Sequence, residues 1–407
     1  MHRFFIKMFN RLMVLYLTLF LVVFACTATD YENNLRVKLK SENIILGAEQ
    51  LTYYLPMLTD KRVGLVVNQT SQVANKHLVD ELIANHVQVQ TIFAPEHGFR
   101  GDHDAGEKFS SSVDEKTGIP LISIYGKNRK PSAEVMSNLD VIIFDIQDVG
   151  VRFYTYISSM HYMMEAASDA GVSFIVLDRP NPNGAFVDGP MLESEFTSFV
   201  GMHKIPLIHG MTVAELALMF KGEGWLNSTN DLNLTVVSMK NYQRSMAYSL
   251  PIKPSPNLPN DVAINLYPSL GFFEATPVSI GRGTDFPFQV IGHDKVSLGD
   301  FEFMPISTPG AASTPKLMNK SLVGQDLRQR NIKGIDLSFI ITWHQAFQVT
   351  KTKFFTRADF MDKLSGTDKL RKAIVAGKTQ QEIKQSWQQG LLKFKGLRKP
   401  YLLYKDL

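Results

Sequence analysis

The sequence contains a single cysteine, Cys26, in 407 residues. One thiol cannot form an intramolecular disulfide, and a cysteine so close to the N-terminus gives no candidate for covalent catalysis.

Net charge is also small, at +4. The first 25 residues carry Arg3, Lys7, Arg11 and no acidic group, so their loss would leave a net charge of +1. This balance provides no basic field for nucleic acid, so we predict no nucleic-acid partner.

Long hydrophobic runs are scarce as well. The one that stands out, Leu12 to Phe24, follows three basic residues, as in a secretory signal peptide, and is too short to span a bilayer alone. It ends in "VVFAC", which suits a bacterial lipoprotein signal whose thiol becomes acylated, although Phe24 is an unusual neighbour there. We predict a signal peptide over residues 1–25 and export to the periplasm or the cell envelope, with membrane attachment through Cys26 left open.

The roughly 380 remaining residues, at 44% hydrophobic content, exceed what one hydrophobic core usually serves. Four prolines in "SLPIKPSPNLPND", residues 249–261, preclude regular helix or strand and mark a boundary. We therefore predict a polar tether over residues 26–45, a first domain over 46–255 and a second over 256–407.

Short β-branched runs alternate with helix-period segments from Arg62 onward, which predicts an α/β fold with a parallel sheet and crossover helices. The predicted strands are "RVGLVVN", "VQVQTIF", "PLISIY", "LDVIIFD", "VSFIVLD" and "LNLTVVSM". Two helices are predicted between these strands, each with one apolar face that packs in the core. The first face contains Leu78, Leu82 and Ile83, and the second contains Ile157, Met160 and Met164. Gly171 is placed to end the second helix, and Thr379 with Glu382 fits a capping box.

Polar residues follow four of these runs directly. Ligands of open parallel sheets bind outside the carboxyl ends of the strands, so four such clusters at one edge indicate a site. The clusters are Asn68, Gln69 and Thr70; Glu96, His97 and Arg100; Asp145, Gln147, Asp148 and Arg152; and Asp178, Arg179, Asn181 and Asn183.

Several specific chemistries lack their motifs. "GDHDAGEKFS" is no phosphate loop, because Glu107 separates the glycine from Lys108, and Phe109 replaces the magnesium-binding hydroxyl. No strand is followed by a dinucleotide-binding glycine pattern, and no serine occupies a nucleophile elbow. A metal site built from His97, Asp102, His103 and Asp104 matches no zinc spacing, but a metal-dependent hydrolase stays an alternative.

Acid and base chemistry by carboxylates remains, in a setting of amides, arginines and aromatic rings that is typical of carbohydrate sites. Glu96 follows a strand, so backbone amides can hold its carboxyl, or apolar neighbours such as Phe93 and Phe99 can raise its pKa. Tyr154 and Tyr156 could stack on sugar faces or pack against the sheet, and both interpretations stay open.

Six segments together resemble one known family. "APEHGFRG", "FDIQDVGVRFYTYISSM", "LDRPNPNG", "IPLIHGMTVAELA", "PSPNLPN" and "SIGRGTDFPF", followed by a closing "YLLY", are similar to the exo-β-N-acetylmuramidases of peptidoglycan turnover, the NamZ/YbbC family. The resemblance extends from about Gly64 to Tyr404. It implies a Rossmann-like N-terminal catalytic domain and a smaller C-terminal α+β domain that closes a cleft. It also implies exo-acting release of β-linked N-acetylmuramic acid from the non-reducing end.

The resemblance also assigns roles, with Glu96 matching the catalytic glutamate. We predict a catalytic set of Glu96, His97, Asp145 and Asp148, with Glu274 and Asp285 as further possible partners of Glu96. The predicted substrate-binding residues are Asn68, Gln69, Arg100, Gln147, Arg152, Tyr154, Tyr156, Arg179, Asn181, Asn183, Asn257 and Arg282. We predict neither a metal nor an organic cofactor. The alternative from another class is an exported lipoprotein that binds muropeptides or glycans without turnover.

Muramic acid carries a lactyl carboxylate that an enzyme selective for it should pair with an arginine. The candidates are Arg100, Arg152, Arg179 and Arg282. Gly281 and Gly283 flank Arg282, which predicts that the backbone approaches the ligand there while the guanidinium points into the cleft.

Overall fold

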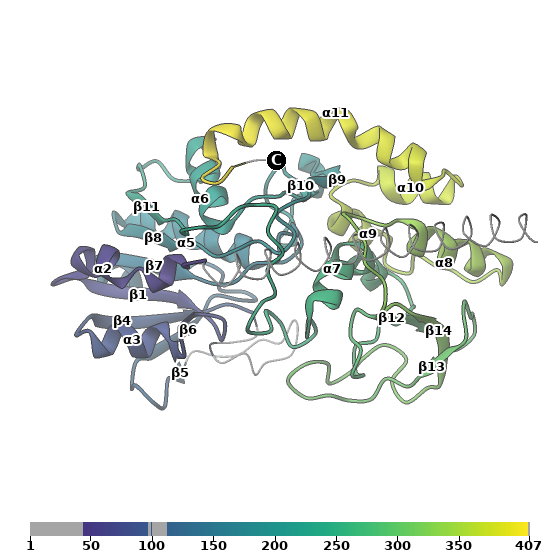
Figure 1. Ribbon diagram of the computed structural model, residues 1–407, viewed down its shortest axis with the longest axis horizontal. Coiled ribbons are helices and arrows are strands. Elements are labelled where there is room, and N and C mark those ends of the chain that lie inside the picture. Colours follow the sequence, from purple (N-terminus) through teal and green to yellow (C-terminus); the bar gives the residue numbers. More distant parts are fainter. Residues whose placement is uncertain (1–43, 97–98, 100–111, 406–407) are drawn as a thin grey trace, which may run out of the picture. The chain divides into compact units, whose positions relative to one another are not determined.

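The structure, a computed structural model, describes residues 44–96, 99 and 112–405. Its main element is a seven-stranded sheet of order β11-β8-β7-β1-β4-β6-β5 (Figure 1). The parallel strands are β1 (Arg62–Val67), β4 (Gln88–Ala94), β6 (Pro120–Ser123), β7 (Val141–Asp145), β8 (Ser173–Leu177) and β11 (Leu234–Val237), and β5 (Ser112–Val113) pairs antiparallel with β6. The α/β prediction is therefore confirmed, and each predicted run contains one parallel strand.

The order of the parallel strands is that of a Rossmann fold. Taken in chain order, the strands lie as third, second, first, fourth, fifth and sixth, with the order reversing between β1 and β7. The crossover helices are α3 (Leu78–Ala84), α4 (Ala133–Ser137), α5 (Tyr156–Ala170) and α6 (Val213–Gly222).

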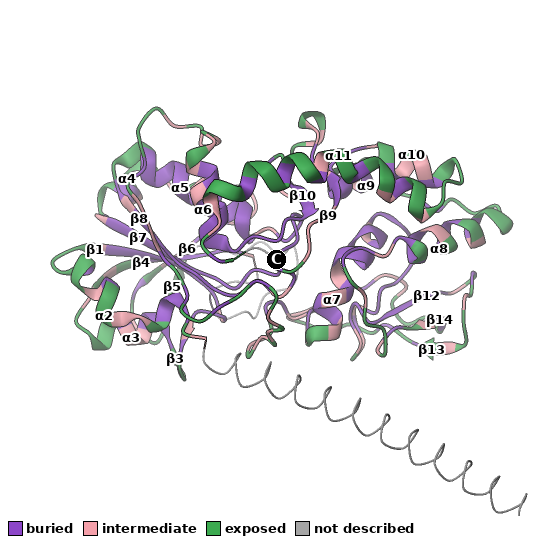
Figure 2. Cartoon of the chain, turned by 45° about the horizontal axis from the view of Figure 1, so that its top comes forward, coloured by how far each residue is buried: buried purple, intermediate pink, exposed green. Residues whose placement is uncertain are grey.

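Alternate side chains of each strand enter separate core clusters on the two faces of the sheet. Val66 and Phe144 pack in one cluster with α5 and α6, whereas Leu65 and Ile143 pack in the other with α3. Figure 2 shows the strands buried and the outer helix faces exposed. The strands read as continuous apolar runs because both of their faces are covered.

The sequence patterns predicted the buried faces and the caps of the helices correctly, except at one residue. Ile157, Met160 and Met164 of α5 are buried, and Gly171 caps the helix in the left-handed conformation at φ 67°, as predicted. Ile83 of α3 is 40% exposed. It follows buried Leu82 directly and is rotated by about 100° from it, because a helix has about 3.6 residues per turn. The apolar stripe of α3 is therefore narrower than predicted.

The C-terminal half combines helices with a small antiparallel sheet, which confirms the α+β prediction. Its sheet has the order β12-β14-β13, from β12 (Val290–His293), β13 (Phe301–Phe303) and β14 (Leu322–Asp326). Its helices are α7 (Asp261–Leu270), α8 (Ser338–Val349), α9 (Ala358–Ser365), α10 (Lys369–Val375) and α11 (Gln380–Arg398). The capping box of Thr379 and Glu382 on α11 is confirmed.

Short elements connect these parts. They are η1 (Gly47–Glu49), α2 (Leu51–Tyr54), η2 (Leu55–Leu58), β2 (Gln72–Val73), β3 (Lys76–His77), β9 (Asp188–Met191), η3 (Ser194–Phe196), β10 (Pro206–Ile208), η4 (Gly271–Ala275) and η5 (Lys399–Tyr401). The proline-rich residues 249–260 form neither helix nor strand, and α7 begins after them with Asn260 as its N-cap.

Residues from Ile45 onward form one compact unit. Helix α11 contacts β9 and β10 of the N-terminal half, as Figure 1 shows. The division at residues 255 and 256 stays a prediction. The predicted signal peptide, Cys26 and nearly all of the tether lie outside the described residues. Among the described helices, none combines the length and apolar character needed to cross a membrane.

Buried hydrogen bonds of Tyr404 join the C-terminal "YLLY" to the sheet, and we call Tyr404, Asp178 and Met239 the C-terminal clasp. The hydroxyl of Tyr404 donates to Asp178, directly after β8, at 2.6 Å, and accepts from the amide of Met239 at 2.8 Å. Burial raises the pKa of Asp178 to about 7, although the Tyr404 hydrogen bond lowers it. The buried pair of Arg244 and Glu215, at 2.6 Å, lies beside this clasp, and Glu215 also accepts from the amide of Leu403.

Arg152 joins the two halves by a different route. Its fully buried guanidinium donates to the main-chain oxygens of Pro190, Ile205, Leu364 and Ser365, at 2.6 to 3.3 Å. Burial lowers its pKa to about 9. The sequence prediction made Arg152 a substrate-binding residue, but this placement gives it a structural role, because the side chain is fully buried and both terminal nitrogens donate inside the protein.

We expect Arg152→Met to destabilise the fold severely. The substitution keeps most of the apolar stem but leaves four carbonyl oxygens without their charged donor, and each buried unsatisfied group costs about 1–3 kcal/mol. A loss of about 3 kcal/mol or more should appear as a lower urea midpoint. Arg62→Met, which removes a partly exposed ion pair with Asp140, is the control and should lose much less. Equal losses for both variants would contradict the assigned role.

Candidate active site

Glu96 lies two residues after β4, at the carboxyl edge of the sheet, and is half-buried. Its carboxylate accepts a hydrogen bond from the Thr155 hydroxyl at 3.0 Å. Thr155 is the N-cap residue of α5, so the carboxylate lies at the N-terminus of a fifteen-residue helix. The next residue, Tyr156, donates to the main-chain oxygen of Glu96 at 3.4 Å. These contacts fix the position of the Glu96 carboxylate.

Tyr125 provides a second hydroxyl to the same carboxylate. It follows β6, the neighbour of β4, and is half-buried. Burial, the charge of Glu96 and the hydrogen bond to Glu96 raise the pKa of the Tyr125 phenol, which therefore stays protonated. The sequence prediction missed Tyr125 as a site residue because it ends the apolar run "PLISIY". The rule applied to the other runs, that polar groups after a strand face the site, would have found it.

Arg282 reaches this region from the C-terminal half. It donates to Glu274 at 2.7 Å, and its guanidinium lies 4.9 Å from the ring centre of Phe288. Burial lowers the pKa of Arg282, but the charges of Glu274 and Glu96 and the phenol of Tyr267 raise it further, so the group stays charged. The charge of Glu96 thus acts on Arg282, although the two residues come from different halves of the chain.

Arg282 lines a cavity of about 360 Å³, within the usual range of ligand pockets. We call it the Arg282 pocket. Its lining residues are Glu274, Ser279, Ile280, Arg282, Ala311, Ala312, Ser313, Thr314, Pro315, Lys316 and Arg357. Three of them are basic and one is acidic, so the pocket suits an anionic group. Asp285 is exposed and is not among the lining residues.

Lys316 holds one side of this pocket in shape. Its ammonium group donates to the main-chain oxygens of Phe273, Glu274 and Thr276, at 2.8, 3.1 and 2.6 Å. Burial lowers its pKa to about 8. Since Glu274 and its neighbours are tied down in this way, the partner of Arg282 is preorganised.

The glycines beside Arg282 have a different role from the predicted one. Gly281 and Gly283 adopt left-handed conformations, at φ 81° and 80°. A Cβ atom would lie 2.4 Å from the main-chain oxygen of Phe286 at the first, and 2.5 Å from that of Ile306 at the second. The protein's own backbone, not a ligand, therefore requires glycine at both positions.

Most predicted polar residues near the point where the strand order reverses bond to the protein itself. The Asp145 carboxylate, fully buried, accepts two hydrogen bonds from Arg179, at 2.5 and 2.9 Å. This bidentate pair uses both oxygens of Asp145, so the structure assigns both residues a structural role and not the predicted catalytic and substrate-binding ones.

The amide side chains beside this pair join loops. Gln147 donates to the Pro180 oxygen at 2.6 Å, Asn181 to the Met211 oxygen at 2.9 Å, and Asn183 to the Val149 oxygen at 2.8 Å. Gln69 donates to the oxygens of Lys253 and Pro254. These placements do not support direct substrate contact by the four side chains.

Two further predicted residues, Asn68 and Asn257, also bond within the protein. Asn68 is fully buried, and its Oδ1 accepts from the amide and hydroxyl of Thr70. Asn257 donates to the oxygen of Ala311, which lines the Arg282 pocket, at 2.7 Å. It therefore positions that wall of the pocket.

The side chains of Tyr154 and Tyr156 are packed inside the protein and are not exposed to a ligand. Their rings meet edge to face at 4.9 Å, both are at most 7% exposed, and Tyr154 donates to the Pro254 oxygen at 2.6 Å. Of the two interpretations, packing describes this structure. Tyr156 still supports the site through its hydrogen bond to Glu96.

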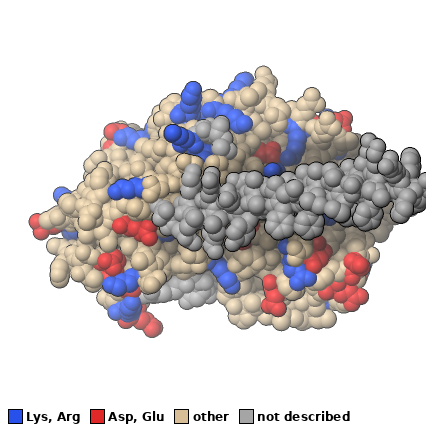
Figure 3. Space-filling model, viewed as in Figure 1, with Lys and Arg blue, Asp and Glu red and all other residues tan. Residues whose placement is uncertain are grey.

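His97 and Arg100 lie outside the described residues, as do Asp102, His103 and Asp104, so their predicted roles stay predictions. Among the described residues, no three His, Cys, Asp or Glu side chains gather as a metal site would require. On the face drawn in Figure 3, basic and acidic side chains are interspersed and neither sign dominates.

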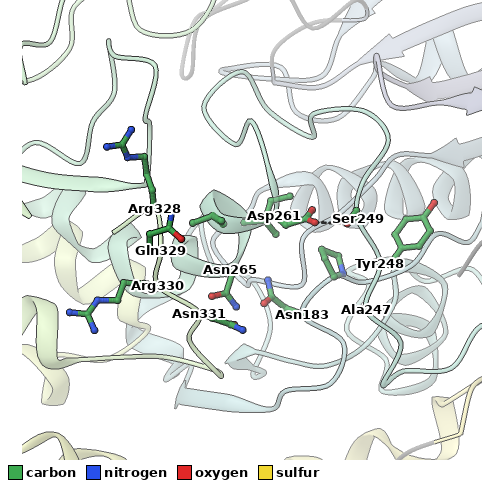
Figure 4. A pocket seen from close by; sticks show the side chains of 13 residues that line it. Asn183, Ala247, Tyr248, Ser249, Asp261, Asn265, Arg328, Gln329, Arg330 and Asn331 are labelled. Carbon is green, nitrogen blue, oxygen red and sulfur yellow. Dashed lines mark hydrogen bonds between the residues drawn. The ribbon is translucent and has the colours of Figure 1, made fainter. Parts of the chain in front are cut away.

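A second cavity, of about 440 Å³, has no pair of carboxyl groups for acid and base chemistry in its described lining. Among the described residues that line it, Asp261 is the only carboxylate, and it accepts from Ser249, as Figure 4 shows. The amides of Asn183 and Asn265 in its wall bond to main-chain groups. Glu96 and the Arg282 pocket are therefore the candidate active site.

A Rossmann-order sheet with an oriented carboxylate and a basic pocket suits acid and base chemistry on an anionic ligand. The sequence profiles of the N- and C-terminal parts of exo-β-N-acetylmuramidase NamZ match residues 63–262 and 265–404. The chain belongs to this NamZ family, as the sequence resemblance predicted.

Individual relatives agree with this assignment. A peptidoglycan β-N-acetylmuramidase NamZ of Bacillus subtilis (strain 168) is 40% identical over 373 residues, covering 86% of this chain and 89% of that protein. Two crystal structures of DUF1343 family proteins from Bacteroides fragilis NCTC 9343 are similar. One has a TM-score of 0.82 and 45% identity, covering 90% of this chain and all of the other. The second has a TM-score of 0.75 and 30% identity, covering 89% and 99%.

Asp148, predicted to be catalytic, lies beneath the tyrosines and is not among the residues that line the Arg282 pocket. Its side chain is buried, and one oxygen accepts from the Gly150 amide at 2.6 Å. Burial raises its pKa to about 7, although the amides of Gly150 and Val149 lower it. The folded protein therefore binds this proton more tightly than the unfolded chain does.

This proton makes the free energy of unfolding fall as the pH rises from about 4, the ordinary pKa of aspartate, to about 7. Asp148→Asn keeps the acceptor for Gly150 and removes the titration. Its stability relative to the parent, measured by urea unfolding, should therefore be greater at pH 8 than at pH 5. Asp231→Asn, whose parent side chain is 84% exposed, is the control and should show no such trend. A pH-independent difference for Asp148→Asn would refute the assignment.

Proposed function

We propose that the protein is an exported, exo-acting glycoside hydrolase that releases terminal β-linked N-acetylmuramic acid from the non-reducing end of peptidoglycan fragments. The observation that carries this proposal is Glu96, whose carboxylate is oriented by two hydroxyls and whose charge acts on Arg282 in a basic pocket of about 360 Å³. Membership of the exo-β-N-acetylmuramidase family supports the same reaction.

Glu96 is the group we assign to proton transfer. Cleavage of a glycosidic bond near neutral pH requires a proton on the departing oxygen, and a positioned carboxyl is the usual donor. Thr155 and Tyr125 hold the Glu96 carboxyl in one orientation, so little freedom is lost when substrate binds. Glu274, which is committed to Arg282, sets the position of the guanidinium.

Arg282 is the group we assign to the lactyl carboxylate. Of the four arginine candidates, Arg152 is fully buried and both of its terminal nitrogens donate to main-chain oxygens, Arg179 is buried and paired with Asp145, and Arg100 lies outside the described residues. Arg282 bonds Glu274 through Nη2 alone, and among the described residues no partner is recorded for Nε or Nη1. Those donors are oriented for a bidentate or bifurcated contact with an anion.

The site of action that we propose is the cell envelope. The support is the basic and apolar N-terminal segment that ends at Cys26, which provides an export signal and a thiol for acylation. Muramic acid saccharides from the cell wall are then the partners, and no nucleic acid is expected.

We expect the purified protein to hydrolyse a chromogenic muramic acid β-glycoside, and Glu96→Gln to lower kcat by about 10²-fold or more without unfolding. Loss of the titrating group with shape retained is the physical reason. Glu302→Gln, at an exposed position on β13, is the control. Saturable binding by the parent without turnover would favour the capture protein instead. Activity lost to a chelator and restored by metal would favour the metal-dependent hydrolase.

Arg282→Ala should weaken turnover of the muramic acid glycoside by about ten- to a hundredfold, because a charge-assisted hydrogen bond contributes about 1.5–3 kcal/mol. Its preference over the matching N-acetylglucosamine glycoside should narrow by the same factor, and Arg282→Lys should restore part of it. The matched control is Arg328→Ala, since Arg328 also pairs with a carboxylate at 2.7 Å and covers an aromatic ring. An unchanged preference in Arg282→Ala would rule out this recognition.

A further inference from the structure

Three half-buried aromatic side chains follow one another across the surface beside Glu96. We call Tyr125, Phe199 and Tyr162 the aromatic strip. The rings of Tyr125 and Phe199 meet edge to face with 5.9 Å between their centres. The rings of Phe199 and Tyr162 are nearly parallel, at 17°, with centres 6.3 Å apart. None of the three is fully buried, so each leaves part of its ring accessible.

The aromatic strip begins at the catalytic group. Tyr125 interacts with the Glu96 carboxylate through its hydroxyl and with Phe199 through its ring. The strip shares no residue with the Arg282 pocket, yet Glu96 interacts electrostatically with a member of each. Glu96 therefore interacts with both a basic pocket and a separate aromatic surface.

The strip is held in place by polar contacts at its centre. The Arg129 guanidinium lies 4.3 Å from the ring centre of Phe199, and its Nε donates to the Gly126 oxygen at 3.2 Å. The Ser158 hydroxyl, on α5, donates to the main-chain oxygen of Phe199 at 2.8 Å. Such anchoring reduces the entropy lost when a ligand packs on the rings.

An exo-acting enzyme holds one sugar on the non-reducing side of the cleaved bond. The rest of the substrate must therefore lie on the other side of Glu96. A sugar ring presents C–H groups on its face and hydroxyls at its edge, and aromatic faces carry the negative charge that attracts C–H groups. Arg129 covers one face of the Phe199 ring, and the strip offers the remaining aromatic faces. Arg129 also offers N–H donors for the hydroxyl and acyl groups at the edge of the sugar.

On this basis, which rests on the function proposed above, we propose that the aromatic strip binds the leaving saccharide. The terminal muramic acid occupies the Arg282 pocket, the next sugar lies against Tyr125, and the following part of the chain lies on Phe199 and Tyr162. The strip thereby selects saccharides longer than the minimal glycoside.

The test compares two substrates of different length. One is the chromogenic muramic acid β-glycoside, whose small leaving group reaches no further than Tyr125. The other is a muramic acid-terminated tetrasaccharide from the peptidoglycan backbone. The measured quantity is the ratio of kcat/KM for the tetrasaccharide to kcat/KM for the chromogenic glycoside, which cancels losses common to both substrates.

We expect Phe199→Ala to lower this ratio about tenfold, and Phe199→Tyr to keep it near the parent value. Phe199→Leu, which preserves apolar volume without the aromatic face, should lie between them and serves if the alanine variant folds poorly. Inhibition by the released trisaccharide should weaken in parallel in Phe199→Ala. Tyr53→Ala, at a 55% exposed position on α2 outside the strip and the pocket, is the control and should leave the ratio unchanged.

A ratio equal to that of the parent in Phe199→Ala would overturn the proposal. So would a ratio that falls equally in Phe199→Tyr, because that result would indicate a steric or folding effect instead of ring contact. Failure of the parent to cleave either substrate would instead refute the proposed function.

Discussion

The structure depends on one constraint, which is that polar groups buried at the carboxyl edge of the parallel sheet must find partners. An unpaired buried polar group costs about as much as several favourable contacts contribute. The bidentate pair of Asp145 and Arg179 meets this demand at the end of β7, and Asp178 with Tyr404 meets it at the end of β8. Gln147 and the asparagines of "LDRPNPNG" complete the network.

This network explains where the active site lies. In a Rossmann-order sheet, ligands usually bind where the strand order reverses, here between β1 and β7. The loops at that point are joined to each other, by Ser71 to the oxygen of Asp145 and by the amide of Gln147 to the hydroxyl of Thr70. The functional groups that remain available are Glu96 and Tyr125, which follow β4 and β6, and the charge of Glu96 acts on Arg282. The site is therefore displaced along the edge, toward the C-terminal half.

The sequence predicted the fold better than the site, for a physical reason. Strands and caps follow from local periodicity, so the parallel strands, Gly171 and the capping box at Thr379 were all predictable. The rule that polar residues after strands face the site predicted the edge where Glu96 lies, but it cannot separate a group bonded internally from one left for a ligand. Arg179 and Arg282 look alike in sequence, and only a partner 34 positions away in the chain, Asp145, distinguishes them. Tyr125 was not predicted as a site residue, because it ends an apolar run and was assigned to the strand.

The geometry between Glu96 and Arg282 depends on bonds outside the site. These two residues belong to different halves of the chain, and neither half positions the other through the pocket itself. Arg152 bonds β9 to the end of α9, Arg398 donates to the oxygens of His209 and Gly210, and Tyr404 fastens the chain terminus to Asp178. All of these partners are buried, so their bonds are strong and little weakened by water. Carboxylate and guanidinium can then remain in catalytic register without a direct bond between them.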